Sequence, residues 1–306
     1  MKHNRTVLSA LSVLLAAAVA ACGGKEDPEL PDFNRGGGDG GTDPVESVYP
    51  AHCDNRVVAH RCGAKEARER TGKSYPDNSI AALTYAQGLG CYAVEIDILW
   101  TKDNNVIVHH GSSGMVNGMH PSQHTLAEIR AAGKLGNNEE IPTLEQFLVQ
   151  TVGASNCTRL WIETKNITNT DLTDEEQETA IFNGFKRACE IIAEMHGEHF
   201  VEFNGAGRTS VFSKMYPIAK AAGYSMSIPM TLPGTTMQKY GWGWANVDIT
   251  TAGLKTSTID DYISRNIDVS LYNLDSEDQI KAWAVYKDQV KGLMTNYPMQ
   301  LLESLK

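Results

Sequence analysis

The sequence predicts a single (β/α)8 barrel, the TIM-barrel fold, over residues 49–306. Short apolar runs, typical of buried strands, alternate along this region with longer amphipathic stretches, typical of helices. Eight runs qualify as strands, and about 255 residues is the usual size of one such barrel. A doubly wound open sheet would give a similar alternation, so the periodicity leaves both architectures open.

The expected elements follow from these runs and from the turn residues between them. Strands are expected at residues 56–60, 92–99, 159–163, 200–203, 224–228, 247–250, 268–272 and 292–295. Helices are expected at residues 79–88, 143–151, 174–195, 209–222, 258–265, 276–285 and 299–305. An additional hairpin strand is expected at residues 106–109, after the turn at 101–105.

Residues 1–21 are expected to be a bacterial lipoprotein signal peptide. A basic head precedes an apolar run over residues 7–21, and small residues lead into Cys22. This resembles a lipobox, which implies that Cys22 becomes the lipid-modified N-terminus; a plain secretory signal is the alternative. Residues 22–48 include a glycine-dense stretch and are expected to be a flexible tether. The chain is therefore expected to be lipid-anchored in the bacterial cell envelope, at the outer membrane, facing the periplasm or the cell surface.

Acidic residues outnumber basic ones, with 37 Asp and Glu against 27 Lys and Arg and a formal net charge of −10. Nucleic-acid binding needs basic surface that neutralises phosphates, so this balance argues against a nucleic-acid partner. An anionic small molecule is still compatible with the composition, because a local cluster of cations can oppose the overall field.

Five cysteines remain after Cys22, an odd number that excludes complete pairing within the chain. No two are spaced as Cys-x-x-Cys, which argues against zinc-ribbon and thioredoxin-type sites. Cys53, Cys91 and Cys157 each precede an expected strand, so we expect all three at one rim of the barrel. One disulfide among them and three reduced thiols are both compatible with this placement.

Two carboxylates interrupt the apolar pattern of the second expected strand. Because side chains alternate, Glu95 and Asp97 share one face, which in a barrel points inward at the end where active sites form. The third strand places Glu163 and Lys165 on its inward face. Carboxylates are costly to bury unpaired, and a hard divalent cation, Ca²⁺ or Mg²⁺, bound by Glu95, Asp97 and Glu163 would remove this cost. Buried ion pairs, for instance between Lys165 and Asp97, are the alternative.

Two histidines also end expected strands. His60 closes the first strand and is followed by Arg61, while His109 closes the hairpin strand. Together with the three carboxylates, this set suits phosphoryl chemistry. Histidine can act as acid and base, arginine and lysine can bind a phosphate, and a metal can neutralise charge.

These residues resemble the glycerophosphodiester phosphodiesterase family, from about residue 57 to residue 302. Eight segments match family motifs in order and at similar spacing. They are Val58-Ala59-His60-Arg61-Cys62-Gly63, Pro76-Asp77-Asn78, Glu95-Ile96-Asp97, Thr101-Lys102-Asp103, Val106-Ile107-Val108-His109, Ile141-Pro142-Thr143-Leu144-Glu145, Ile162-Glu163-Thr164-Lys165 and Thr295-Asn296-Tyr297-Pro298.

The resemblance implies a TIM barrel with a short insertion after the second strand, at about residues 111–140, and an enzyme of lipid metabolism. Matching residues would make Glu95, Asp97 and Glu163 the metal ligands, His60 and His109 the acid/base pair, and Arg61 and Lys165 the phosphate-binding residues. The family cleaves small glycerophosphodiesters to sn-glycerol 3-phosphate and an alcohol. A neighbouring glycerol hydroxyl would attack phosphorus, and water would then open the cyclic phosphate. Which histidine plays which part stays open.

Five positions near the expected site depart from the family pattern, among them Cys62, which is small enough to fit, and Asp77, a conservative replacement of Glu. His110 stands where the family usually has an acid, Asn296 replaces the Asp of a Thr-Asp-Tyr-Pro motif, and Tyr272 sits where the family often has Trp. None of them removes a metal ligand or a member of the histidine pair. The resemblance therefore implies an active enzyme whose substrate preference can differ from the common one.

Two other functions are weighed against this one. A lyase of the sphingomyelinase D type has a related barrel and cyclises choline-bearing lipids; the Ile-Pro-Thr-Leu-Glu stretch argues against it. A surface lipoprotein could bind lipid headgroups or sugars without turnover; the complete set of ligands and histidines argues against that. Trp242 and Trp244 are expected in a loop over the barrel rim, or alternatively in a platform for a choline-type headgroup.

Overall fold

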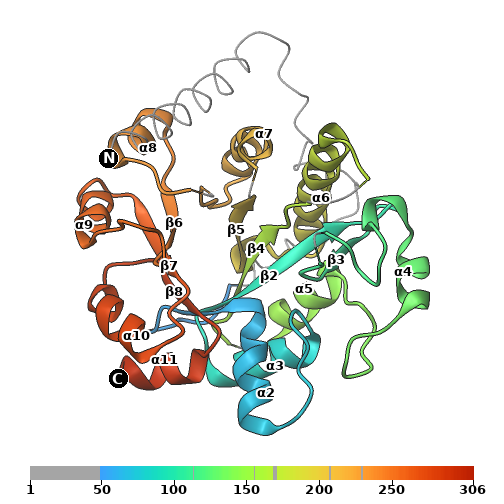
Figure 1. Cartoon of the computed structure of the whole chain (residues 1–306), viewed down its shortest axis with the longest axis horizontal. Coiled ribbons are helices and arrows are strands. Elements are labelled where there is room, and N and C mark those ends of the chain that lie inside the picture. The colour runs from blue at the N-terminus through green and yellow to red at the C-terminus, as the bar shows by residue number, and fades with distance from the viewer. Residues whose placement is uncertain (1–48, 113, 155, 168–170, 207, 229) are drawn as a thin grey trace, which may run out of the picture.

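Parallel strands form the wall of a barrel that helices surround (Figure 1). The computed structural model describes residues 49–112, 114–154, 156–167, 171–206, 208–228 and 230–306. The expected signal peptide, Cys22 and the tether lie outside the described residues. Within the described part, no helix is long and apolar enough to cross a membrane.

The strand order confirms the predicted barrel. Neighbouring strands are, in turn, β5 (Val201–Ala206), β4 (Arg159–Thr164), β2 (Ala93–Trp100), β1 (Val57–Ala59), β8 (Gly292–Thr295), β7 (Asp268–Tyr272) and β6 (Trp244–Asp248). An open sheet would leave β5 and β6 as edges. Instead, Met226 pairs with Phe203 of β5 and Ile228 pairs with Ala245 of β6, both in parallel, so the segment between them brings the sheet nearly to closure.

Helices follow the strands and cover the outside of the barrel (Figure 1). The hairpin strand β3 (Val106–Val108) pairs antiparallel with β2, as expected. The helices are α2 (Ala64–Thr71), α3 (Ile80–Leu89), α4 (Leu126–Ala132), α5 (Leu144–Gly153), α6 (Asp174–Glu194), α7 (Thr209–Ala221), α8 (Gly234–Tyr240), α9 (Thr256–Ser264), α10 (Glu277–Trp283) and α11 (Pro298–Ser304). Short 3-10 turns occur at η1 (His60–Gly63), η2 (Pro121–Gln123), η3 (Glu198–Phe200) and η4 (Ala284–Tyr286).

Local sequence fixes where several helices begin. Helices α4, α5, α6 and α10 each start after a Thr or Ser whose side chain caps the helix, with Glu or Gln three residues later completing a capping box. The last helix is also held from outside. Buried Glu66 of α2 accepts hydrogen bonds from the backbone N–H groups of Met299 (2.7 Å) and Gln300 (3.0 Å) in the first turn of α11. This contact joins α2, the first helix of the barrel, to α11, the last one.

A layer of large side chains closes the amino-terminal end of the barrel. This floor consists of Val58, Tyr92, Ala93, Trp161, Trp244 and Met294. The Trp161 and Trp244 rings meet edge to face with centroids 4.7 Å apart. Because Trp161 and Glu163 share the inward face of β4, the floor lies directly beneath the carboxylates.

Two expectations about this end of the barrel are wrong. Strand β6 begins at Trp244, three residues before the expected run, because this tryptophan belongs to the floor. Trp242 and Trp244 also form no platform at the rim. Both are buried, with Trp242 packed against Phe212 and Tyr240. The expected strand at 224–228 is reduced to single bridges.

The chain enters the barrel at this closed end. Tyr49 stacks on His199, with ring centroids 4.0 Å apart, and the Ala51 N–H donates to Asn156 O (3.1 Å). Nearby, the Cys53 and Cys157 thiols both approach Gly90 O, at 3.8 and 3.7 Å, next to Cys91. The three cysteines therefore share one rim as expected, and all of the cysteines in the described part are free thiols.

We expect the floor to tolerate no additional side-chain atom at Gly292. A Cβ there would lie 2.4 Å from the Trp161 ring and 2.9 Å from Val58. Overpacking of this kind costs about 1–3 kcal/mol, so Gly292→Ala should lower the melting temperature by about 2–10 °C. Gly88→Ala is the matched control, because a Cβ at Gly88 has no neighbour within 4 Å. Equal melting temperatures for the two variants would contradict this account of the floor.

Candidate active site

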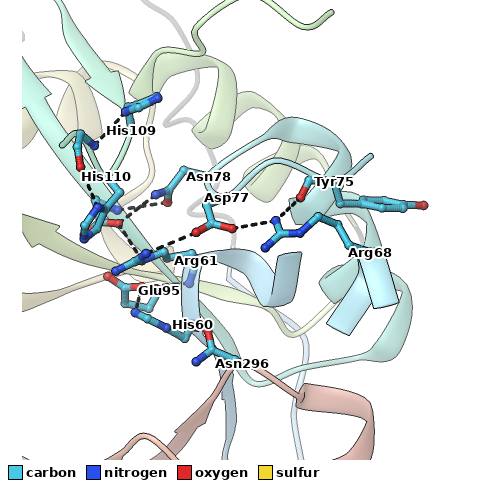
Figure 2. A network of polar contacts seen from close by, with 12 residues as sticks. His60, Arg61, Arg68, Tyr75, Asp77, Asn78, Glu95, His109, His110 and Asn296 are labelled. Atoms are coloured by element: carbon cyan, nitrogen blue, oxygen red, sulfur yellow. Dashed lines mark hydrogen bonds and ion pairs between the residues drawn. The ribbon is translucent and has the colours of Figure 1, made fainter. Parts of the chain in front are cut away.

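The predicted site residues gather at the carboxyl end of the barrel strands (Figure 2). Glu95 and Asp97 project from β2, Glu163 from β4, and His60 and Arg61 from the η1 turn after β1. Carboxylate oxygens of Glu95, Asp97 and Glu163 all lie within 4.8 Å of one another. The structure thus brings together the three carboxylates that the sequence singled out.

The three carboxylates differ in their surroundings. Glu95 and Asp97 each retain 1% of their surface, whereas the Glu163 side chain retains 30%. Burial, reinforced by the charges of Asp97 and Glu163, raises the pKa of Glu95 well above its usual value. Burial also opposes the charge of Asp97, but Lys165 and His110 hold the pKa of Asp97 below its usual value. Glu95 is the carboxylate with the greatest electrostatic need for a cation.

Lys165 supplies part of the positive charge that the three carboxylates require. Its ammonium lies 3.1 Å from Asp97 Oδ1 and 3.4 Å from Glu163 Oε1, so the ion pair considered as an alternative to a metal site is present. It leaves one oxygen unsatisfied. Glu95 Oε1 is buried and has no hydrogen-bond partner among the described residues. The donor set fits a hard divalent cation, because three carboxylates converge and one of them still lacks a partner.

A left-handed turn in η1 aims the backbone at this cluster. Arg61, Cys62 and Gly63 have φ values of 46°, 64° and 67°, a conformation that costs roughly 1–2 kcal/mol at a non-glycine residue. The turn directs the Arg61 N–H at Glu95 Oε2, 3.0 Å away. Gly63 allows the turn to pack closely, since a Cβ there would lie 2.7 Å from Pro298.

The guanidinium of Arg61 is positioned by Asp77. Arg61 Nη1 donates to Asp77 Oδ2 (3.3 Å), and Arg68 donates to the other Asp77 oxygen (2.8 Å). Arg61 Nε lies 3.6 Å from Asp97 Oδ2, is buried, and has no hydrogen-bond partner in the described part of the chain. A buried N–H with no hydrogen bond, in the same cluster as the unbonded Glu95 Oε1, fits a site that takes both an anion and a cation.

Asn78 fixes the second carboxylate. Its side chain donates to Asp97 Oδ2 (2.9 Å) and accepts from the Asp97 backbone N–H (3.2 Å). Asn78 is fully buried and has a positive φ of 60°. Asn78 belongs to the Pro76-Asp77-Asn78 motif, but no pattern in the sequence indicates its contact with Asp97.

His60 lies between Glu95 and Asn296, the residue that follows β8. Its Nδ1 is 2.8 Å from Asn296 Oδ1, and its Nε2 is 3.8 Å from Glu95 Oε2. Burial and the neighbouring Arg61 charge lower the pKa of His60. Asn296, which sequence reasoning noted only as a lost charge, is therefore a direct partner of His60.

Gly111 contacts both His109 and His110, the first through its N–H and the second through its carbonyl oxygen. The Gly111 N–H donates to His109 Nδ1 (2.8 Å), whereas His110 Nδ1 contacts Gly111 O (2.8 Å). Figure 2 shows the His110 ring on the side of Asn78 and Arg61, and the His109 ring beyond the turn. The His110 charge lowers the pKa of Asp97, while burial lowers the pKa of His110 itself.

A hollow of about 420 Å³ lies beside these groups. Its lining includes Arg61, Asp77, His109 and His110, with Lys134 at its edge. Lys134 forms an ion pair with Glu140 (2.6 Å) within the expected insertion. The hollow provides space for a small molecule in contact with both Arg61 and His109.

Comparison with known proteins gives one family. Residues 71–300 match the sequence model of the glycerophosphoryl diester phosphodiesterase family. No curated protein sequence matches the chain.

Solved structures show the same barrel. A glycerophosphodiester phosphodiesterase from Parabacteroides distasonis is 21% identical with a TM-score of 0.66, covering 83% of this chain and 98% of the other. A putative glycerophosphoryl diester phosphodiesterase from Silicibacter pomeroyi is 15% identical with a TM-score of 0.65, covering 85% and 96%. A phosphodiesterase from Oleispira antarctica, solved with the product sn-glycerol 3-phosphate, is 17% identical with a TM-score of 0.60, covering 82% and 96%.

We expect a divalent cation to stabilise the protein through Glu95. At about one hundred times its dissociation constant, a ligand adds about 2.7 kcal/mol, so Ca²⁺ or Mg²⁺ should raise the melting temperature by about 5–10 °C. Glu95→Gln should abolish this rise and still fold, because it removes a charge that burial disfavours. Asp248→Asn, the same type of change in a carboxylate at the end of β6, should keep the rise. Equal rises in wild type and Glu95→Gln would exclude Glu95 as a ligand.

Proposed function

The chain belongs to the glycerophosphoryl diester phosphodiesterase family, whose reaction is the hydrolysis of glycerophosphodiesters, and we propose that it releases sn-glycerol 3-phosphate and an alcohol with a divalent cation at Glu95, Asp97 and Glu163. One observation carries the metal-dependent part of this proposal. The buried donor Arg61 Nε, which is ion-paired with Asp97, and the buried acceptor Glu95 Oε1 both lack a hydrogen bond in the described structure and belong to the same cluster. The first calls for an anion and the second for a cation.

The charge balance supports a phosphodiester as that anion. When all three carboxylates are ionised, as metal ligands are, they and the two cations Arg61 and Lys165 leave one net negative charge in the cluster. A divalent cation would turn this into one positive charge, which matches the single negative charge of a phosphodiester. When bound, Ca²⁺ or Mg²⁺ would neutralise charge that develops on the phosphoryl oxygens.

The histidines are proposed to move the protons. The neighbouring glycerol hydroxyl attacks phosphorus and gives its proton to His60 Nε2, while the bond from phosphorus to the alcohol oxygen breaks. His109 enters this step as an imidazolium, a form that requires the Gly111 N–H to release Nδ1, because both ring nitrogens then carry protons. Its Nε2 proton passes to that oxygen, so the alcohol leaves uncharged. Water then opens the cyclic phosphate with the two roles reversed. His109 is assigned to the leaving side because it lines the hollow next to Arg61.

Arg61 and Lys165 are proposed to hold the phosphate. The Arg61 Nε–H makes no hydrogen bond, and Asp77 holds the guanidinium in place. Lys165 already contacts two carboxylates, so its contribution to phosphate binding is that of a nearby positive charge.

A turnover assay tests the reaction. Glycerophosphocholine, glycerophosphoethanolamine and glycerophosphoinositol are incubated with the protein, and sn-glycerol 3-phosphate is measured with added Ca²⁺, Mg²⁺ or EDTA. We expect release that EDTA abolishes. His60→Ala and His109→Ala should each lower it by about 10²- to 10⁴-fold. The control His52→Ala changes an exposed histidine and should leave the rate intact.

The products separate this proposal from the other functions. A cyclic phosphate that accumulates without glycerol 3-phosphate would favour a lyase of the sphingomyelinase D type. Saturable binding of the headgroups without any product would favour a binding lipoprotein.

We also propose that the protein is anchored in the bacterial cell envelope by a lipid on Cys22. The support is the lipobox-like sequence before this residue and the basic head with its apolar run. When the full chain is expressed in a bacterium, wild type should partition into detergent and incorporate labelled fatty acid, and Cys22→Ala should do neither. Wild-type protein that stays in the aqueous phase would refute the anchor. Protease treatment of intact cells would distinguish the periplasmic from the surface face.

A further inference from the structure

A chain of hydrogen bonds connects His60 to a carboxylate that lies outside the metal cluster. His60 Nδ1 is 2.8 Å from Asn296 Oδ1, and Asn296 Nδ2 is 2.6 Å from Asp275 Oδ2. The three residues follow β1, β8 and β7, which are neighbours in the barrel wall. Figure 2 shows Asn296 against the His60 ring.

The carboxylate fixes the orientation of the Asn296 amide. An ionised carboxylate only accepts hydrogen bonds, so the amide NH₂ must face Asp275 and the amide oxygen must face His60. The opposite orientation would replace this hydrogen bond by two oxygens 2.6 Å apart, which repel each other.

The amide orientation in turn fixes the proton of neutral His60. Because Asn296 Oδ1 only accepts, His60 Nδ1 must carry the proton and donate it. Nε2, which is 3.8 Å from Glu95 Oε2, is then the nitrogen with the free lone pair. His60 can act as a base toward the carboxylate cluster only through this nitrogen, because Nδ1 is bound to Asn296.

Asp275 is itself held firmly. Its Oδ1 accepts from the Asn296 backbone N–H (2.8 Å) and from Thr295 Oγ1 (3.1 Å). Its own backbone N–H donates to Gln279 Oε1 (2.9 Å) at the start of α10. The carboxylate therefore has a defined place from which to orient Asn296.

We propose that Asp275 is a positioning residue that acts through Asn296 to keep the proton of His60 on Nδ1 and the lone pair on Nε2. Its catalytic meaning rests on the proposed function, whereas the placement of the proton does not. Asn296 replaces an acid of the family motif, and Asp275 supplies a negative charge one residue farther from His60. His60 thus keeps an oriented acceptor although position 296 is uncharged.

Three nearly isosteric variants of the full chain test the inference. In Asp275→Asn, two amides face each other and the Asn296 amide is free to turn its NH₂ toward His60. In the double variant Asp275→Asn with Asn296→Asp, the acceptor next to His60 is a carboxylate, and the amide at position 275 donates to it. Asp288→Asn, at an exposed residue, is the matched control.

The first readout is the proton position, measured by ¹⁵N NMR of the histidine rings. The chain has nine histidines, so the His60 signals are assigned from their loss in His60→Gln. We expect Nδ1–H in wild type, in Asp288→Asn and in the double variant. In Asp275→Asn we expect a population with the proton on Nε2. This measurement needs no turnover, so its result is independent of whether the proposed activity is found.

The second readout is turnover of the best glycerophosphodiester. Loss of a partner that orients a functional side chain typically costs 10- to 100-fold, so kcat of Asp275→Asn should fall by about that factor with KM and melting temperature nearly unchanged. The double variant should regain most of kcat.

Either readout can overturn the inference. His60 with its proton on Nε2 in wild type would refute it. So would an unchanged His60 tautomer in Asp275→Asn, or a double variant no more active than Asp275→Asn.

Discussion

Concentrating three carboxylates at one end of a closed barrel is the constraint on which the other features of the site depend. Two of them have almost no contact with solvent, and their mutual repulsion adds to the cost of desolvation. Several neighbouring groups offset this desolvation and repulsion cost. Lys165 and Arg61 supply positive charge, Asn78 donates to Asp97, and the left-handed turn after β1 donates a backbone N–H to Glu95. The strained backbone of that turn is explained by the hydrogen bond that it allows the Arg61 N–H to donate to Glu95.

The carboxylate cluster could be predicted from the sequence because it lies on strands. Side chains on a strand alternate, so charges at Glu95, Asp97 and Glu163 had to share the barrel interior, and the structure places them there. His60 and Arg61 were recognisable from their place at the end of the first strand. The barrel itself followed from the alternation of elements, although only the bridges at Met226 and Ile228 exclude an open sheet.

The supporting residues could not be predicted in the same way. Asn78 and Asp275 lie in turns, where no periodicity indicates the direction of a side chain, and their partners are distant in sequence. The start of β6 was misplaced because Trp244 is buried in the floor, whereas a Gly-Trp-Gly-Trp segment suggests a loop. Helix α2 was not expected, since its polar sequence lacks an apolar stripe and its Glu66 is buried as a cap for α11.

The first described residues and the carboxylates lie at opposite ends of the barrel strands. Tyr49 and Ala51 are fastened beside the floor, and the carboxylates open at the other end of the same strands. Any group joined to the chain before Tyr49 therefore starts at the end of the barrel remote from the carboxylates. The mouth of the barrel is then left open to small diffusing molecules.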